Sequence, residues 1–388
     1  MGDYHILLGQ GLTIWTGFSF GKSNNATNRK RYDNFIKAST SSNENRFLRG
    51  GAIHLGTENW SLLFFYSKNQ QDANIKLDES GKEYVSSLIQ TGLHRNINEL
   101  EKKDALTILL YGGHFKLQLK YFSIGVTATS THFTIPIKPN TSPNQLFEFD
   151  GKHLNNYGAD YGLKLWKAHF YGETAISSGG GYSFINGIEM HINSRFEISV
   201  QMRNYAKNYH NFFASPDAEN NKPSNERGLY IGTKLLLSRG LILQAYADYF
   251  SFPWVKFQQD APSHGLEYRV YLVYEINPNT KMHLKLKYKE KEINFSTTQD
   301  GKTNFLKAQT KYSWQFQFNY RISHHIELKN RIEMTHFQIV SNKTDIGFLI
   351  YQDLSYQSSN QNFTYHARIT LYNTSSFKSA IYAYENDL

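Results

Sequence analysis

Hydrophobic and polar residues alternate one by one along most of this chain. Residues 311–321 read Lys-Tyr-Ser-Trp-Gln-Phe-Gln-Phe-Asn-Tyr-Arg, so every even position is aromatic and every odd position is polar. Successive side chains of a β-strand point to opposite faces, whereas a helix would mix the two sets. The segment is therefore predicted to be a strand with one aromatic face and one polar face.

The same alternation returns from one end of the chain to the other. It is found at 60–72, 104–112, 115–130, 156–166, 168–176, 195–207, 226–238, 240–250, 266–276, 281–291, 324–336, 346–356 and 362–372. With both ends included, the pattern predicts about 17 or 18 strands, many of them about 10 residues or longer. Ordinary strands average about 5–6 residues, and a tilted strand needs about 9–11 to cross a bilayer.

Short turns and long polar connections follow one another between these segments. Tight links such as 57–59 and 277–280 alternate with longer ones such as 22–45, 73–103 and 211–226. An antiparallel membrane barrel has this arrangement, with short turns at one rim and long loops at the other. The predicted fold is all-β, an antiparallel transmembrane β-barrel of about 16–18 or more strands in the bacterial outer membrane.

One domain over residues 1–388 is the simplest partition, since no linker or internal repeat interrupts the pattern. The long connection at about 83–104 is expected to be partly helical, because Asn96 and Glu99 have the spacing of a capping box. The chain begins without the basic and apolar regions of a signal peptide and ends close to a strand. We therefore expect it to be truncated at both ends.

Composition narrows the classes of function. The chain has no cysteine, which excludes thiol nucleophiles and cysteine-ligated metal. Its aromatic content of 15% argues against disorder. The 15 histidines form no carboxylate–histidine cluster at ligand spacing, so neither a metal nor a cofactor is predicted. No nucleophile elbow is present, so an enzyme is not predicted.

Two glycine-containing segments have a plain interpretation. Residues 17–23, Gly-Phe-Ser-Phe-Gly-Lys-Ser, have three residues between the glycines where a phosphate loop needs four. Gly9-Gln10-Gly11 is interpreted as a bend in the first strand rather than as a ligand cradle.

Positive charge is concentrated in one segment. The net charge is +9, and residues 281–291 place lysines and one histidine on one face opposite Met282, Leu284 and Leu286. A charge facing lipid costs roughly 2–4 kcal/mol at the midplane, so this face is predicted to point into the lumen. The candidate substrate-binding residues on it and on neighbouring strands are Lys281, His283, Lys285, Lys287, Lys289, Lys329, Arg331 and Arg269.

Two interpretations of these residues remain open. One is an internal ion-pair network that holds the wall together, since Glu327 and Glu333 lie close by in the sequence. The other is a positive conduit or docking surface for an anionic substrate.

Aromatic residues near strand ends suit the interfacial girdles of a membrane barrel. Trp60, Tyr66, Tyr288, Tyr312 and Trp314 are the examples. Stacking of nucleic-acid bases is the competing use of aromatics beside lysines. Only the tyrosines with the parity of the lumen face are candidates for it, namely Tyr230, Tyr246 and Tyr271.

Several segments carry a family resemblance. These are residues 2–23, Asn43-Glu-Asn-Arg-Phe-Leu-Arg-Gly50, Thr91-Gly-Leu-His-Arg95, Lys103-Asp-Ala-Leu106 and Tyr382-Ala-Tyr-Glu-Asn-Asp387. They resemble a Bacteroidota-type outer-membrane protein family with an amino-terminal helix-hairpin-helix region similar to the competence DNA-binding protein. The resemblance covers the β-rich part only, and it implies further strands after residue 387. The DNA association that it implies would rest on the region that this chain lacks.

Three hypotheses of function follow. The first is a channel or docking barrel with a positively charged lumen wall for an anionic substrate, DNA among the candidates. The second is a structural or assembly protein whose long loops bind partner proteins. The third is a barrel enzyme that hydrolyses lipid. Outer-membrane lipid is an expected partner in each of them.

Overall fold

A computed structural model describes residues 2–19, 21–40, 47–296, 304–339, 344–358 and 363–384. Two 3₁₀ turns, Pro143–Gln145 and Phe377–Ser379, and one short helix, α1 (Ile97–Leu100), accompany the strands in these residues. The strands are β1 (Gly2–Ile6), β2 (Ile36–Ala38), β3 (Leu48–Gly56), β4 (Trp60–Gln71), β5 (Ala73–Leu77), β6 (Glu83–Leu88), β7 (Leu106–Gln118), β8 (Phe122–Ile137), β9 (Gly151–Leu165), β10 (Ala168–Ser177), β11 (Tyr182–Asn193), β12 (Phe196–Tyr205), β13 (Glu226–Ser238), β14 (Leu241–Phe252), β15 (Ser263–Asn277), β16 (Thr280–Ser296), β17 (Asn304–Arg321), β18 (Ile326–Ile339), β19 (Asp345–Gln357) and β20 (Thr364–Thr374).

Sequential antiparallel pairing builds a single curved wall. Each strand from β7 to β20 pairs with the next, and β3 and β4 continue the wall through the β4–β7 pair. Of the twenty described strands, sixteen form this wall; β1 and β2 lie inside it, and β5 and β6 form a projecting hairpin. The prediction of an all-β antiparallel fold with long strands is confirmed.

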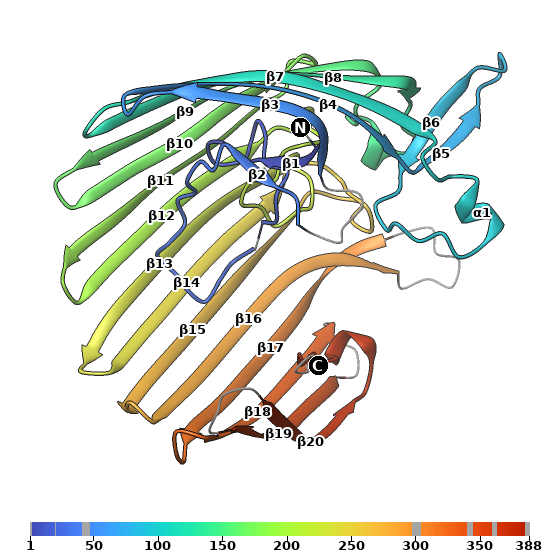
Figure 1. Cartoon of the computed structure of the whole chain (residues 1–388). Helices are drawn as coiled ribbons and strands as arrows, with labels where there is room; N and C mark the ends of the chain where they lie inside the picture. The colour runs from blue at the N-terminus through green and yellow to red at the C-terminus, as the bar shows by residue number, and fades with distance from the viewer. Residues whose placement is uncertain are drawn as a thin grey trace.

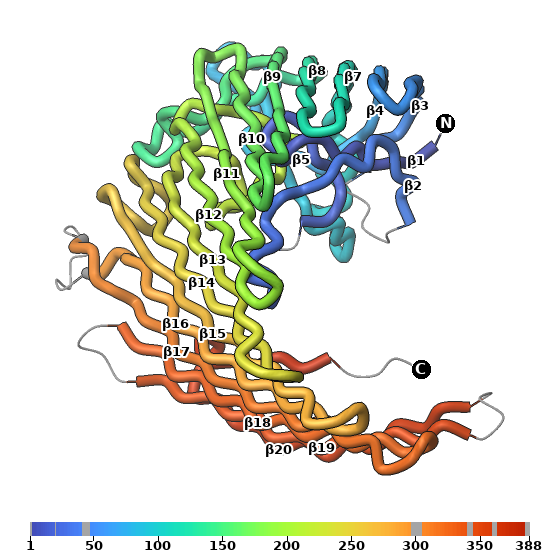
Figure 2. The backbone as a smooth tube through the Cα atoms, turned by 90° about the vertical axis from the view of Figure 1, so that its left-hand side faces the viewer, coloured from blue at the N-terminus to red at the C-terminus, as the bar shows by residue number. Residues whose placement is uncertain are grey.

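The wall is open along one side. Among the described residues β20 pairs only with β19, and no pairing joins it to β3 or β1. Figure 2 shows the resulting trough, with the N-terminus and the C-terminal strands on opposite sides of the gap. The sheet has the curvature of a barrel, whereas the closure that the sequence predicted is not seen.

The two faces of the wall differ in chemistry as the alternation predicts. Every wall strand exposes large apolar side chains on its outer face. Examples, one from each strand, are Ile53, Phe64, Tyr111, Val126, Tyr157, Ile176, Tyr182, Met202, Ile231, Tyr249, Tyr268, Leu286, Trp314, Ile332, Ile350 and Ile369. The inner face carries most of the buried polar and charged groups. Since a continuous apolar band would be unfavourable in water, the outer face fits a hydrocarbon environment.

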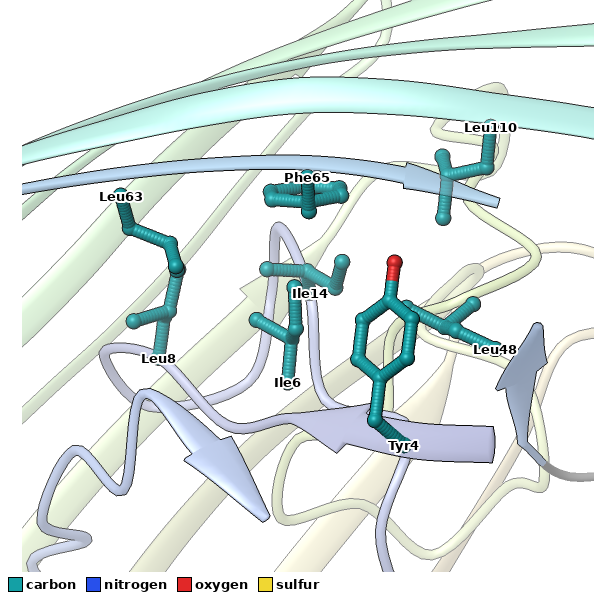
Figure 3. Packing of buried hydrophobic residues seen from close by; sticks show 8 residues of the cluster. All are labelled: Tyr4, Ile6, Leu8, Ile14, Leu48, Leu63, Phe65 and Leu110. Carbon is teal, nitrogen blue, oxygen red and sulfur yellow. The ribbon is translucent and has the colours of Figure 1, made fainter. Parts of the chain in front are cut away.

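Two segments fold into the trough and pack against its inner face. They are residues 7–19 with 21–35, here called the inner segment, and residues 206–225, here called the inner loop (Figure 1). Ile6, Leu8 and Ile14 pack against Leu63 and Phe65 of β4 (Figure 3). The sequence predicted long rim loops at 22–45 and 211–226, and this is wrong for the described residues. Their buried apolar and charged groups find partners only inside the wall.

The loop around α1 agrees with its prediction in part. Asn96 caps α1, and its side chain accepts the N–H of Glu99 at 2.9 Å. The preceding part of the predicted loop forms β6 instead. Within the described residues, no helix is both long enough and apolar enough to cross a membrane. Residues 20, 43–46 and 385–387 of the resemblance motifs lie outside the described residues.

Candidate functional site

The lysine face of β16 points inward. Leu286 lies on the outer face with 43% of its surface exposed, whereas its neighbours Lys285 and Lys287 are only partly exposed on the inner face. At the turn end, Lys281 forms an ion pair with Glu275 at 2.6 Å, and both side chains are close to half exposed. The next inward residue, His283, lies 2.9 Å from the hydroxyl of Tyr271 through its Nδ1 atom.

Two lysines of the inward-facing row on β16, here called the lysine ladder (Lys281, Lys285, Lys287, Lys289 and Lys291), share one buried carboxylate. Glu267 of β15 is 2% exposed and lies 3.1 Å from the Nζ of Lys287 and 3.2 Å from that of Lys289. Glu267 also accepts a 2.5 Å hydrogen bond from the hydroxyl of Tyr246. These contacts tie β14, β15 and β16 together on their inner face, so this part of the ladder is structural.

The inner segment contributes a lysine to the same network. Lys22 lies 2.5 Å from Asp248 of β14 and 3.8 Å from Glu267. Glu219 of the inner loop binds Lys22 at 3.2 Å and also binds Lys289. Burial alone would lower the pKa of Lys22, but the three carboxylates together raise it above its ordinary value. The lysine is thus a fixed cation that anchors the inner segment.

Arg269 also holds the inner segment. It donates to the backbone carbonyl of Ser23 and, at 3.3 Å, to the side-chain oxygen of Asn24. Its guanidinium lies 4.5 Å from the ring centre of Tyr246. The residue is 6% exposed, so the structure shows it in a packing role rather than in contact with a solute.

A fully buried arginine, absent from the sequence prediction, forms the centre of the network. Arg203 of β12 binds Glu226 of β13 at 2.6 Å and makes a bidentate contact with Asp248 at 2.8 and 3.1 Å. Glu226 in turn accepts the backbone N–H groups of Glu219 and Asn220 in the inner loop. A buried charge requires a paired and hydrogen-bonded partner, and here each carboxylate has several donors.

The inner loop is tied to the inner segment by a second buried pair. Arg29 forms an ion pair with Asp217, and its guanidinium lies 4.7 Å from the ring centre of Tyr230. Burial by itself would raise the pKa of Asp217, but Arg29 holds it below its ordinary value. Asp217 is therefore a buried carboxylate that stays charged.

The glycine pair near the N-terminus has a use that the sequence interpretation missed. Gly9 and Gly11 both have positive φ, and the loop that they bound presents its amides to the buried carboxylate of Glu173. One oxygen of Glu173 accepts the N–H of Gln10 at 2.6 Å and that of Leu12 at 3.0 Å. The other accepts the N–H and the hydroxyl of Thr13 at 2.8 and 2.7 Å. The segment is a cradle for a wall carboxylate, not a bend in a strand.

The lumen-facing tyrosines proposed for base stacking have other partners. Tyr230 and Tyr246 pack against each other with ring centres 5.2 Å apart, and both are nearly fully buried. The hydroxyl of Tyr230 donates to the carbonyl of Ala26 at 2.8 Å. The assignment of these two rings to stacking is therefore wrong; they receive the inner segment.

The remaining predicted residues lie on the side of the trough that the inner segment leaves unfilled. Arg331 of β18 pairs with Glu333 of its own strand. Lys329 lies opposite Asp353 in the register, but Asp353 is held by Arg368 at 2.5 and 2.7 Å. Neither Lys285 nor Lys329 forms an ion pair with any described residue. These two are called the unpaired lysines below.

The predicted set therefore divides in three. Lys287 and Lys289 belong to the ion network, and Arg269 holds the inner segment by hydrogen bonds. Lys281, His283 and Arg331 contact other residues of the wall, and the unpaired lysines form no ion pair with a described residue. In the part of the chain that the structure describes, no group of three His, Asp or Glu side chains is arranged to hold a metal ion.

No family model and no curated protein matches the sequence. The structure is similar to OpdK of Pseudomonas aeruginosa, solved with vanillate, at 10% identity over 85% of this chain and 86% of that chain, with a TM-score of 0.40. It is similar to a BenF-like porin from Pseudomonas fluorescens Pf-5 at 9% identity, 84% and 94% coverage and a TM-score of 0.37.

A third similar structure is outer-membrane expressed OmpT of Vibrio cholerae, at 8% identity, 83% and 90% coverage and a TM-score of 0.36. Similarity at this level does not decide where the protein is located, so the outer-membrane location stays a prediction. Similarity at this level assigns neither a family nor a function, so the resemblance to the helix-hairpin-helix family stays a prediction.

Proposed function

We propose that the protein is an outer-membrane β-barrel channel in which the unpaired lysines bind anionic solutes on their way through the lumen. The inner segment and inner loop fill one side of the trough. The unpaired lysines, Lys285 and Lys329, lie on the inner face of the other side. A lysine without a carboxylate partner keeps its full attraction for an anion.

The observation that carries this proposal is the contrast along one strand. On β16, Lys287 pairs with Glu267 and Lys289 pairs with Glu267 and Glu219, whereas Lys285 has no carboxylate within ion-pair distance among the described residues. The ladder is therefore paired only in part: besides Lys285, Lys291 also forms no ion pair with a described residue. Of the two, Lys285 is the one that lies near the middle of the strand.

The apolar outer face supports the membrane part of the proposal. Backbone groups without hydrogen bonds cost several kcal/mol each in hydrocarbon. The edge of β20, and the part of the β3 edge beyond its pairing with β1 at Leu48–Gly50, therefore require partners there. The proposal therefore includes closure of the wall at these two edges. DNA as the anion and partner proteins bound through the 73–103 loop stay predictions, for which these contacts give no specific support.

Ion selectivity tests the proposal. In planar bilayers under a KCl gradient, the reversal potential of the protein should show a preference for chloride. The double variant Lys285→Gln/Lys329→Gln should lose most of that preference while conductance persists.

The matched control is Lys76→Gln/Lys82→Gln, which removes the same charge from the exposed β5–β6 hairpin region and should leave selectivity unchanged. The proposal would be overturned if the protein produced no channel conductance in the bilayer. It would also be overturned if the Lys285→Gln/Lys329→Gln variant kept the full preference for chloride.

A further inference from the structure

A cavity of about 390 Å³ lies at the short-turn end of the wall, between the inner segment and β4, β7 and β9. Lys30, Tyr32 and Asp33 line it from the inner segment, and Lys116, Lys164 and His169 line it from the wall. The volume is within the range of small-molecule sites, about 300–1,000 Å³. The cavity is on the filled side of the trough, away from the unpaired lysines.

Cations outnumber carboxylates around this cavity. Five cationic side chains line it, namely Lys30, Arg31, Lys116, Lys120 and Lys164, against the three carboxylates Asp33, Glu58 and Asp160. Its lining therefore carries a formal charge of +2 when both histidines are neutral.

The carboxylates on the inner side of the cavity are already engaged. Lys116 pairs with Asp33 and lies 3.4 Å from Asp160. Asp33 also accepts the N–H of Gly9 at 2.6 Å. These contacts satisfy Lys116, but they leave the excess charge on the other lysines.

Lys30 and Lys164 carry that excess. The Nζ of Lys30 lies 2.7 Å from Nε2 of His169 and 4.8 Å from the ring centre of Tyr32. Burial, and then the nearby charges of Lys116 and Lys164, lower the pKa of Lys30 to about 8. The fold thus holds an ammonium group beside other cations with no carboxylate bound to it among the described residues.

We propose that this cavity binds a small phosphate monoester, with Lys30, Lys164 and His169 around the phosphate and the ring of Tyr32 beside the organic part. A phosphate dianion matches the charge of +2. Lysine binds phosphate as a point charge, and a neutral imidazole can donate one further hydrogen bond. The proposal concerns a different side of the lumen from the unpaired lysines, so either one can fail without the other.

Calorimetric titration of the protein in detergent micelles with glycerol 3-phosphate tests this site. We expect saturable binding of one molecule per chain at pH 7. Lys30→Gln and Lys164→Gln should each weaken it at least tenfold, whereas Lys76→Gln, on the exposed β5–β6 hairpin, should leave it unchanged. Lys164→Arg should retain most of the affinity because it keeps the charge.

Three results would overturn the proposal: no binding of glycerol 3-phosphate, equal affinity in the Lys164→Gln variant, or succinate binding as tightly as the phosphate ester. Lys164 has no side-chain hydrogen bond or ion pair with a described residue. Lys164→Gln should therefore fold normally, and it carries the test alone if Lys30→Gln fails to fold.

Discussion

Glu173 is the residue whose neutralisation should release the inner segment from the wall. Its two oxygens accept three backbone N–H groups and one hydroxyl from the Gln10–Thr13 loop. In Glu173→Gln the side chain keeps its size, but one oxygen becomes an NH₂ group that cannot accept. If the NH₂ group faces Thr13, the Thr13 hydroxyl can rotate to accept from it, but the backbone N–H of Thr13 loses its acceptor. In the opposite orientation, the backbone N–H groups of Gln10 and Leu12 lose theirs. At least one buried amide is therefore left without an acceptor.

The magnitude follows from these contacts. A buried N–H without an acceptor costs about 1–3 kcal/mol. Each of the two remaining N–H groups then bonds to a neutral oxygen instead of a charged one, which weakens that hydrogen bond by about 1 kcal/mol. Removal of a buried charge offsets part of the loss. The sum is roughly 3–4 kcal/mol, which corresponds to about a 10²–10³-fold larger population of the released segment.

Trypsin reports on that population, because Arg29, Lys30 and Arg31 form a cleavage site that the trough protects. Cleavage of a transiently opened segment follows the open population when closing is fast. We expect rapid cleavage at residues 29–31 in Glu173→Gln, detected by mass spectrometry. Glu275→Gln removes an inward carboxylate near the rim, and it should be cleaved at residues 29–31 no faster than the unmodified protein. Equal cleavage in Glu173→Gln and the unmodified protein would refute the cradle.

Three further outcomes are expected. Gly9→Ala should also expose the trypsin site, because φ is +56° and the added Cβ would lie 2.7 Å from a Glu173 oxygen; Gly81→Ala, at φ +76° with open space, should not. Arg203→Met should lower the free energy of unfolding in urea by about 3–5 kcal/mol because it leaves buried carboxylates without their partner. Arg49→Met breaks an exposed ion pair with Asp3 and should change the free energy of unfolding by only about 0–1 kcal/mol. A loss in Arg203→Met no larger than that in Arg49→Met would contradict the buried network.

The third outcome concerns pH and Lys256, whose pKa is lowered from 10.5 to about 8 by burial and then by Lys291. Between these two pH values the unfolded chain binds more protons, so stability should rise with pH in the unmodified protein. Lys256→Met should lack this rise. If the melting temperatures of the unmodified protein and of Lys256→Met changed identically across pH 8–10.5, the prediction would be wrong.

The alternation made the fold class and the faces of the wall predictable. A period of two fixes which residues share a face, and the energetic cost of charge in lipid then fixes which face is inward. The lysines of 281–291 were placed correctly on this basis. Their partners were not, because Glu267 and Glu219 reach them through strand register and a folded loop, neither of which the local pattern encodes.

The inner segment and inner loop were missed for a related reason. Residues 22–40 and 211–225 are polar, and polar segments between strands are usually surface loops. Here their charges pair with carboxylates spread over distant strands, such as Asp248 and Glu226. The available signal was the number of acidic residues with inward parity, Glu173, Glu226, Asp248 and Glu267, each of which needs a cation or donor inside the trough.

One face of β16 meets lipid and the other faces the lumen, and this orientation can be measured because the chain has no cysteine. Single cysteines at Lys285 and Leu286 would be treated with a charged, membrane-impermeant thiol reagent after reconstitution into liposomes that have been made permeable to it. We expect rapid labelling of Lys285→Cys and protection of Leu286→Cys. Labelling of Leu286→Cys as fast as Lys285→Cys would contradict this orientation.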